Sequence, residues 1–130
     1  MGDGRGLLIG QSFAKDKVFD LFLKGSGITP FSRFGDGRAI LKSSIREYIG
    51  AEAMHGLRIP TSRSLMFFSS SEKVQRDQFE TAAMIIRTSK SHIRFGNFEY
   101  FYYKNDSENL KKLIDSVSYT HLTLPTSNGV

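Results

Sequence analysis

The stretch "VFDLFLKGSGITPFSRFGDGRAILKSSIREYIG", residues 18–50, decides the fold class of this chain. Its first seven residues are rich in β-formers and predict a strand that ends at Lys24. A Gly-Ser-Gly turn follows, and an irregular segment then leads to Gly-Asp-Gly-Arg at residues 35–38. The segment 39–57 predicts a helix, because its apolar residues recur at spacings of three and four and Gly56 lies at its expected end.

Further strands are predicted on both sides of this stretch. Leu7-Leu8-Ile9 predicts a short strand that forms a hairpin with the strand ending at Lys24. Residues 62–70 and 81–89 predict two more strands, joined by a polar connection. The aromatic segment 93–103 follows them.

The chain is expected to close with a helix that ends near Val117. Its apolar residues recur at helical spacing, and either Asp106 or Ser107 is in place to act as its N-cap. The predicted order is therefore β-β-α-β-β-α, and the fold class is α+β with an antiparallel sheet.

Composition limits the kinds of partner. The 130 residues suit one folded domain, and the apolar runs are too short to span a bilayer. Without cysteine there is no disulfide framework or thiolate metal site, and the three histidines have no ligand spacing, so we expect no metal site in this segment. The 18 basic and 13 acidic residues give a net charge of +5, which favours an anionic partner. No targeting signal is legible, so the compartment is left open.

The tetrapeptide Gly-Asp-Gly-Arg occurs twice, at residues 2–5 and 35–38. Two glycines one residue apart allow positive φ angles and expose backbone N–H groups, which suits an anion. An ordinary glycine-rich turn is the alternative interpretation of each copy.

The order of the elements gives this repeat a context. A kinase-type small lobe builds its phosphate-binding site from a glycine-rich turn, then a strand with a lysine, then a helix with a glutamate. This chain has the same order, with Lys24 at the end of the strand and Glu47 on the helix. We therefore predict an ion pair between Lys24 and Glu47, with Glu52 as the competing partner. In the alternative interpretation, Lys24 and Glu47 are both exposed to solvent and unrelated.

Three segments closely resemble, in order and spacing, the selenoprotein O family of pseudokinase-like protein adenylyltransferases. They are "GDGRGLLIG", "LKGSGITPFSRFGDGRAILKSSIREYIGAEAMHGLRIPTSRSL" and "SHIRFGNFEYF". The resemblance covers residues 2 to about 117 and implies a fragment, 1–117, from the N-terminal side of a longer protein. This fragment is a kinase-like small lobe with an αC-type helix, truncated before the catalytic large lobe. Residues 118–130 leave the family pattern and are expected to form a disordered or artefactual tail outside it.

The resemblance also implies a reaction. Family members bind ATP in a flipped orientation and transfer AMP to Ser, Thr or Tyr hydroxyls of proteins, with Mg²⁺. The catalytic Asp and the Mg²⁺ ligands lie in a later segment, so the isolated fragment is expected to be inactive. The implied partners are ATP and protein substrates, without nucleic acid or membrane, for a monomer that is cytoplasmic if bacterial and mitochondrial if eukaryotic.

Carried onto this chain, the resemblance implies one set of ATP-binding residues. They are Gly2, Gly4, Arg5, Lys24, Asp36, Gly37, Arg87 and Arg94. Glu47 is implied to orient Lys24, and no catalytic or metal-binding residue is expected within the chain. We further predict that Arg87 and Arg94 converge on the cleft that contains Lys24. Such a convergence would itself indicate an anionic ligand, because clustered cations repel one another without one.

Two other classes of function are kept as alternatives. A non-catalytic pseudokinase-like scaffold fits the same residues, because resemblance to a kinase does not guarantee turnover. A basic RNA-binding module would use the net charge together with the aromatic residues of segment 95–103 for base stacking.

Overall fold

The structure, a computed structural model, describes residues 4–15 and 17–122. The chain forms two compact units, Gly2–Lys90 and Ser91–Val130. The first holds the sheet and one helix, and the second is helical. This content agrees with the predicted α+β class.

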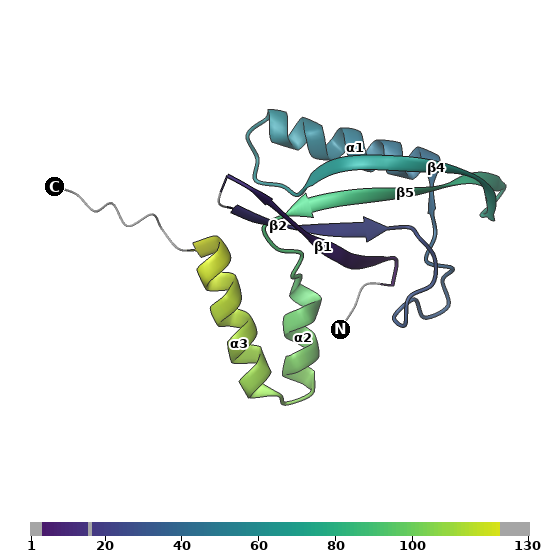
Figure 1. The fold of residues 1–130 in the computed structure, drawn as a ribbon. Coiled ribbons are helices and arrows are strands. Elements are labelled where there is room, and N and C mark those ends of the chain that lie inside the picture. The colour runs from purple at the N-terminus through teal and green to yellow at the C-terminus, as the bar shows by residue number, and fades with distance from the viewer. Residues whose placement is uncertain (1–3, 16, 123–130) are drawn as a thin grey trace. The chain divides into compact units, whose positions relative to one another are not determined.

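The first unit is built on an antiparallel sheet of five strands (Figure 1). The strands are β1 (Gly6–Ala14), β2 (Lys17–Lys24), β3 (Ala39–Ile40), β4 (Arg63–Gln75) and β5 (Phe79–Ser89). The strand β5 is central, because it pairs with β2, β3 and β4. β2 and β3 pair with successive parts of β5, so they share one of its edges and β4 occupies the other.

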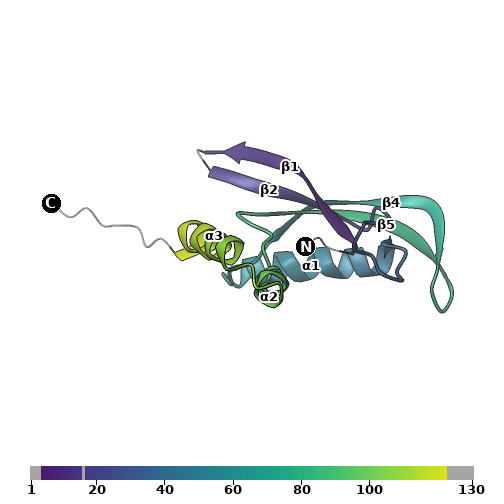
Figure 2. The same ribbon diagram turned by 90° about the horizontal axis from the view of Figure 1, so that it is seen from below.

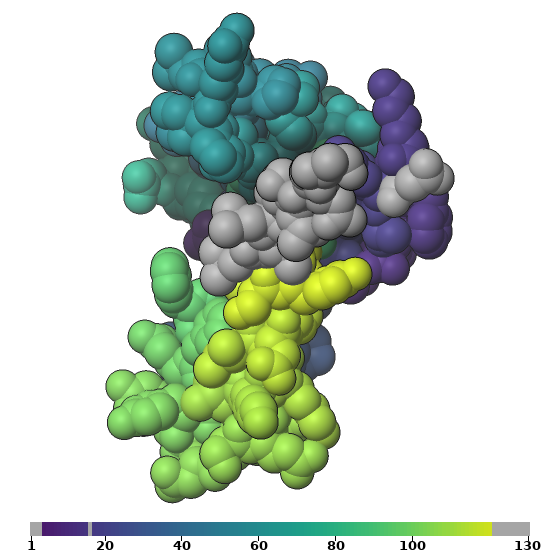
Figure 3. Space-filling view, turned by 90° about the vertical axis from the view of Figure 1, so that its left-hand side faces the viewer, coloured from purple at the N-terminus to yellow at the C-terminus, as the bar shows by residue number. Residues whose placement is uncertain are grey.

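The helix α1 (Leu41–Gly56) runs along one face of this sheet beside β4 and β5 (Figure 2). Its buried residues, Ser44 and Ala51, are small, and so are the buried Ala82 and Ala83 of β5. Small side chains let the helix approach the sheet closely, around the fully buried Ile85. The teal surface in Figure 3 includes α1.

The predicted helix 39–57 is correct except at its ends. Ala39 and Ile40 pair with Ala83 and Ala82 as strand β3, so the helix begins only at Leu41. Backbone pairing with β5 thus overrides the helical spacing of these two residues.

The strands are longer than predicted. β1 and β2 form the expected hairpin, but β1 continues to Ala14 and pairs along the whole of β2. The segment 71–80, predicted as a polar connection, is mostly strand, and the turn between β4 and β5 shrinks to residues 76–78. Val74 explains this difference, because it is only 4% exposed among polar neighbours and pairs opposite Glu80.

The second unit contains α2 (Phe95–Tyr103), α3 (Ser107–Val117) and the π-helical turn η1 (Ser118–Leu122). Asp106, not Ser107, is the N-cap of α3, because its carboxylate accepts a hydrogen bond of 3.1 Å from the Asn109 N–H. None of the helices described is both long enough and apolar enough to cross a membrane.

Candidate functional site

The ion pair predicted between β2 and α1 is present. Lys24 Nζ donates to Glu47 Oε2 at 2.6 Å, and both side chains are about a quarter exposed. Glu52 was the wrong alternative, since it accepts two hydrogen bonds from the guanidinium of Arg63, at 2.8 and 2.6 Å. Glu47 is therefore the partner of Lys24.

A second cation binds the same carboxylate. Arg87 Nη1 donates to Glu47 Oε1 at 3.0 Å. The sheet register explains the approach, because Lys24 lies opposite Ile85 and Arg87 is two residues further along β5, on the same face. Lys24, Glu47 and Arg87, the Glu47 cluster, thus come from three elements.

The Glu47 cluster carries a net positive charge. Two cations share one carboxylate whose two oxygens are both engaged, so one positive charge is left uncompensated within the cluster. Arg87 Nη2 also donates to the main-chain and side-chain oxygens of Ser62, while its Nε is buried without a hydrogen-bond partner. A fixed and partly desolvated excess of positive charge favours the binding of an anion beside it.

The described part of the first tetrapeptide, Gly4 and Arg5, lies beside the end of β2. Gly2 is outside the described residues, but Gly4 and Arg5 lead directly into β1, whose first residue pairs with Lys24. The Gly4 carbonyl accepts a hydrogen bond from the Ser32 hydroxyl at 2.5 Å, and a Cβ on Gly4 would lie 2.8 Å from the Phe31 carbonyl oxygen. The backbone of this turn is therefore held close to the segment that leads to the second tetrapeptide.

The second tetrapeptide forms a tight turn before β3. Gly37 has a φ of +66°, and a Cβ there would lie 1.8 Å from the carbonyl oxygen of Gly27, so only glycine fits. Asp36 accepts hydrogen bonds from the Arg38 N–H and, through both oxygens, from Arg76. The Arg76 guanidinium lowers the pKa of the Asp36 carboxyl below its ordinary value.

Gly25 connects the two tetrapeptides. Its N–H donates to the Arg5 carbonyl at 2.7 Å, and its own carbonyl accepts from the Ala39 N–H at 3.4 Å. Because Gly25 follows Lys24, the end of the first tetrapeptide and the residue after the second are both bonded to the residue next to the cluster lysine.

Comparison with known proteins assigns the chain to a family. The family model described as "Protein adenylyltransferase SelO" matches residues 1–127. This chain belongs to the SelO family. The matched range includes residues 118–127, and the expected departure of the tail from the family pattern stays a prediction.

Curated relatives of the SelO-family chain carry the name protein nucleotidyltransferase YdiU. The chain is 56% identical to the protein from Pseudoalteromonas atlantica over 118 residues, which are 88% of this chain and 24% of that protein. It is 50% identical to the Pectobacterium atrosepticum protein and 53% identical to the Aeromonas salmonicida protein, each over 122 residues, 93% of this chain and 25% and 26% of those proteins. The chain spans about a quarter of the length of these curated relatives.

Arg94 of this SelO-family chain belongs to the second compact unit. It is the N-cap of α2, where its backbone N–H donates to Asn97 Oδ1 at 2.9 Å. Arg87 reaches the same carboxylate as Lys24, but the predicted convergence of Arg87 and Arg94 on a nucleotide cleft stays a prediction.

Magnesium does not fit the part of the SelO-family chain described here. Among residues 4–15 and 17–122, no three His, Cys, Asp or Glu side chains are grouped so that they could hold a metal ion.

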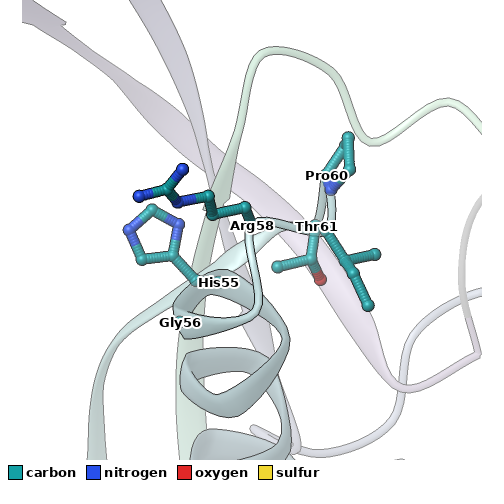
Figure 4. Close-up of a pocket in the computed structure, with 6 residues that line it drawn as sticks. His55, Gly56, Arg58, Pro60 and Thr61 are labelled. Atoms are coloured by element: carbon teal, nitrogen blue, oxygen red, sulfur yellow. The ribbon is translucent and has the colours of Figure 1, made fainter.

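A surface hollow of about 590 Å³ lies where α1 ends, lined by His55, Gly56, Arg58, Ile59, Pro60 and Thr61 (Figure 4). It contains none of the predicted ATP-binding residues.

One residue of the site region had no signal in the sequence. Arg76 lies in the turn between β4 and β5, within a segment that reads only as polar. The length of the β4–β5 hairpin brings it to Asp36, and hydrophobic periodicity alone does not reveal that length.

Proposed function

We propose that this chain is the nucleotide-binding part of a protein adenylyltransferase, which transfers AMP from ATP to Ser, Thr or Tyr hydroxyls of proteins. The observation that supports it most is the sharing of Glu47 by Lys24 and Arg87 in a SelO-family chain. In this proposal the sheet and α1 are a kinase-like small lobe, with α1 in the role of the αC helix.

The Glu47 cluster binds the phosphates in this proposal. Glu47 holds the Lys24 ammonium group in place, and Arg87 presents a planar guanidinium that suits phosphate oxygens. The two tetrapeptides supply further contacts from Gly2, Gly4, Arg5, Asp36 and Gly37. Arg94, which belongs to the second unit, is a further candidate that the family resemblance implies.

The reaction needs groups that this chain does not supply. The hydroxyl oxygen of the acceptor attacks the α-phosphorus of ATP, the bond to the β-phosphate oxygen breaks, and pyrophosphate leaves with the bonding electrons. The base that takes the hydroxyl proton, and the ligands of Mg²⁺, belong to the remaining three quarters of a full-length family protein. The 130-residue chain is therefore inactive alone, because positioning and charge neutralisation act as a unit in such transfers.

The test uses labelled ATP and an acceptor protein. The full-length family protein that contains this segment is expected to incorporate AMP, its Lys24→Met variant to lose most incorporation, and the 130-residue chain to show none. Lys17→Met is the matched control, because Lys17 is an exposed residue at the start of the same strand. Strong AMP incorporation by the 130-residue chain would contradict the claim that the base and the metal ligands lie elsewhere.

The same proteins separate the alternative functions. A scaffold would bind ATP or protein partners and transfer no AMP even at full length. An RNA-binding module would bind single-stranded RNA with an affinity that falls steeply between two salt concentrations. Either result would contradict the proposed transferase function and support the corresponding alternative.

A further inference from the structure

Arg76 forms three hydrogen bonds to the second tetrapeptide. Its Nη1 donates to Asp36 Oδ2 at 2.8 Å, and its Nη2 donates to Asp36 Oδ1 at 3.0 Å. Nη2 also donates to the Arg38 carbonyl at 3.2 Å. One guanidinium thus binds both the side chain and the backbone of the turn.

Arg76 is itself held in position at the tip of the β4–β5 hairpin. Its N–H donates to the Gln78 carbonyl at 3.0 Å, and its Nη1 donates to the Gln75 carbonyl at 2.7 Å. A planar group anchored at its own backbone loses less conformational freedom when it binds a carboxylate than a free side chain does. The hairpin tip is therefore a prepared partner for the turn.

A second ion pair ties the turn to the same hairpin. Arg38, the last residue of the tetrapeptide, pairs with Glu72 of β4. Arg38 also forms an isolated antiparallel bridge with Ser26, next to the close contact between Gly37 and Gly27. The turn is consequently fixed from the hairpin on one side and from the end of β2 on the other.

The hydrogen bonds at Asp36 also limit what that carboxylate offers a ligand. An ionised carboxylate has about four lone-pair sites, and the Arg38 N–H and the two Arg76 donors occupy three of them. Asp36 therefore has room for one further donor, and its main task in this structure is to hold the turn.

We propose that Arg76 is a positioning residue, which fixes the turn at residues 35–38 in the conformation that binds the nucleotide. Its importance for ligand binding rests on the proposed function, while its effect on the turn does not. The chain supplies a matched control in Arg46, an exposed arginine of α1 whose side chain reaches Ser43 Oγ at 3.4 Å.

The first measurement is the dissociation constant of ATP for the full-length family protein and its variants. Arg76→Gln is expected to weaken ATP binding about tenfold, because charged hydrogen bonds that order a binding turn are lost. Arg76→Lys should recover part of the affinity by restoring the charge, and Arg46→Gln should bind as the wild type does. In an Asp36→Asn background, Arg76→Gln should cost little further affinity, because the interaction between the two side chains is already lost.

The second measurement is hydrogen exchange at the Arg38 amide, which requires no nucleotide. Exchange should accelerate in Arg76→Gln and remain unchanged in Arg46→Gln. If the wild type fails to bind ATP, the proposed function is wrong, and the exchange result alone decides whether Arg76 fixes the turn. The inference would be overturned if the Arg38 amide exchanged in Arg76→Gln at the wild-type rate. It would also be overturned if partial unfolding of the Arg76→Gln variant accounted for its whole loss of ATP affinity.

Discussion

Lys24 and Arg87 are held by opposite oxygens of one carboxylate, that of Glu47. Lys24 Nζ lies 2.6 Å from Oε2, and Arg87 Nη1 lies 3.0 Å from Oε1. Glu47 therefore sets the position of two cations at once, and changes at this carboxylate should affect both.

Replacing Glu47 with glutamine should destabilise the first unit. The substitution keeps the shape but leaves two partly buried cations without their shared charge, so the free energy of unfolding should fall by about 1 to 2 kcal/mol. Thermal unfolding followed by circular dichroism measures the effect, a fall of about 2 to 8 °C in the midpoint. Asp20→Asn is the control, because its exposed hydrogen bond from Gln11 keeps an acceptor. Equal midpoints for the two variants would show that the cluster does not stabilise the fold.

Replacing Arg87 with lysine should weaken ATP binding although the charge is kept. Arg87 reaches Glu47 with Nη1 and Ser62 with Nη2, and a single ammonium group has no such fork. We expect the dissociation constant of ATP for the full-length family protein to rise about tenfold. Calorimetric titration measures it, with Arg46→Lys as the control. Unchanged affinity in Arg87→Lys would show that ATP binding does not depend on the forked guanidinium of Arg87.

The pair between Asp36 and Arg76 should make stability depend on pH in acid. Hydrogen bonding to Arg76 lowers the pKa of Asp36 from its ordinary 3.8, so the pair stabilises the fold fully above that value. The stabilisation is lost as pH falls through the lowered pKa, where the folded protein takes up the proton. Unfolding midpoints of the wild type and Asp36→Asn should differ most above about pH 5 and converge below 3.8. A difference that does not change with pH would exclude this pairing.

Replacing Gly37 with alanine should disrupt the second tetrapeptide. The added Cβ would lie 1.8 Å from the Gly27 carbonyl oxygen in a backbone with φ of +66°, so we expect a loss of at least about 2 kcal/mol. Gly50→Ala is the opposite control, because the space around this helical glycine is open and alanine favours helix by up to about 1 kcal/mol. Urea unfolding measures the change in the free energy of unfolding, which should fall in Gly37→Ala and rise in Gly50→Ala. A stable Gly37→Ala protein would show that the turn adopts another conformation.

Local parts of the site could be predicted from the sequence. Lys24 and Glu47 lie on a strand and a helix that are neighbours in the sequence, and the order of a strand lysine and a helix glutamate predicted their pairing. The convergence of Arg87 came from the family resemblance, because a cross-strand register over such a separation has no signature in composition or periodicity.

The parts that could not be predicted depend on strand pairing. Ala39 and Ile40 have helical spacing, yet β5 takes them into the sheet. The β4–β5 hairpin extends through polar residues because Val74 is buried, and only this extension brings Arg76 to Asp36. Such competition between local preference and long-range pairing is decided by tertiary packing.

The central place of β5 has a consequence for how the protein folds. The hairpins β1–β2 and β4–β5 join neighbouring segments and can close rapidly, whereas the pairing of β2 with β5 joins distant ones and pays a larger loop-closure entropy. Lys24 and Arg87 lie on the two strands of that slow pairing. The three residues of the Glu47 cluster are therefore expected to come together only in the step that pairs β2 with β5, after the two hairpins have formed.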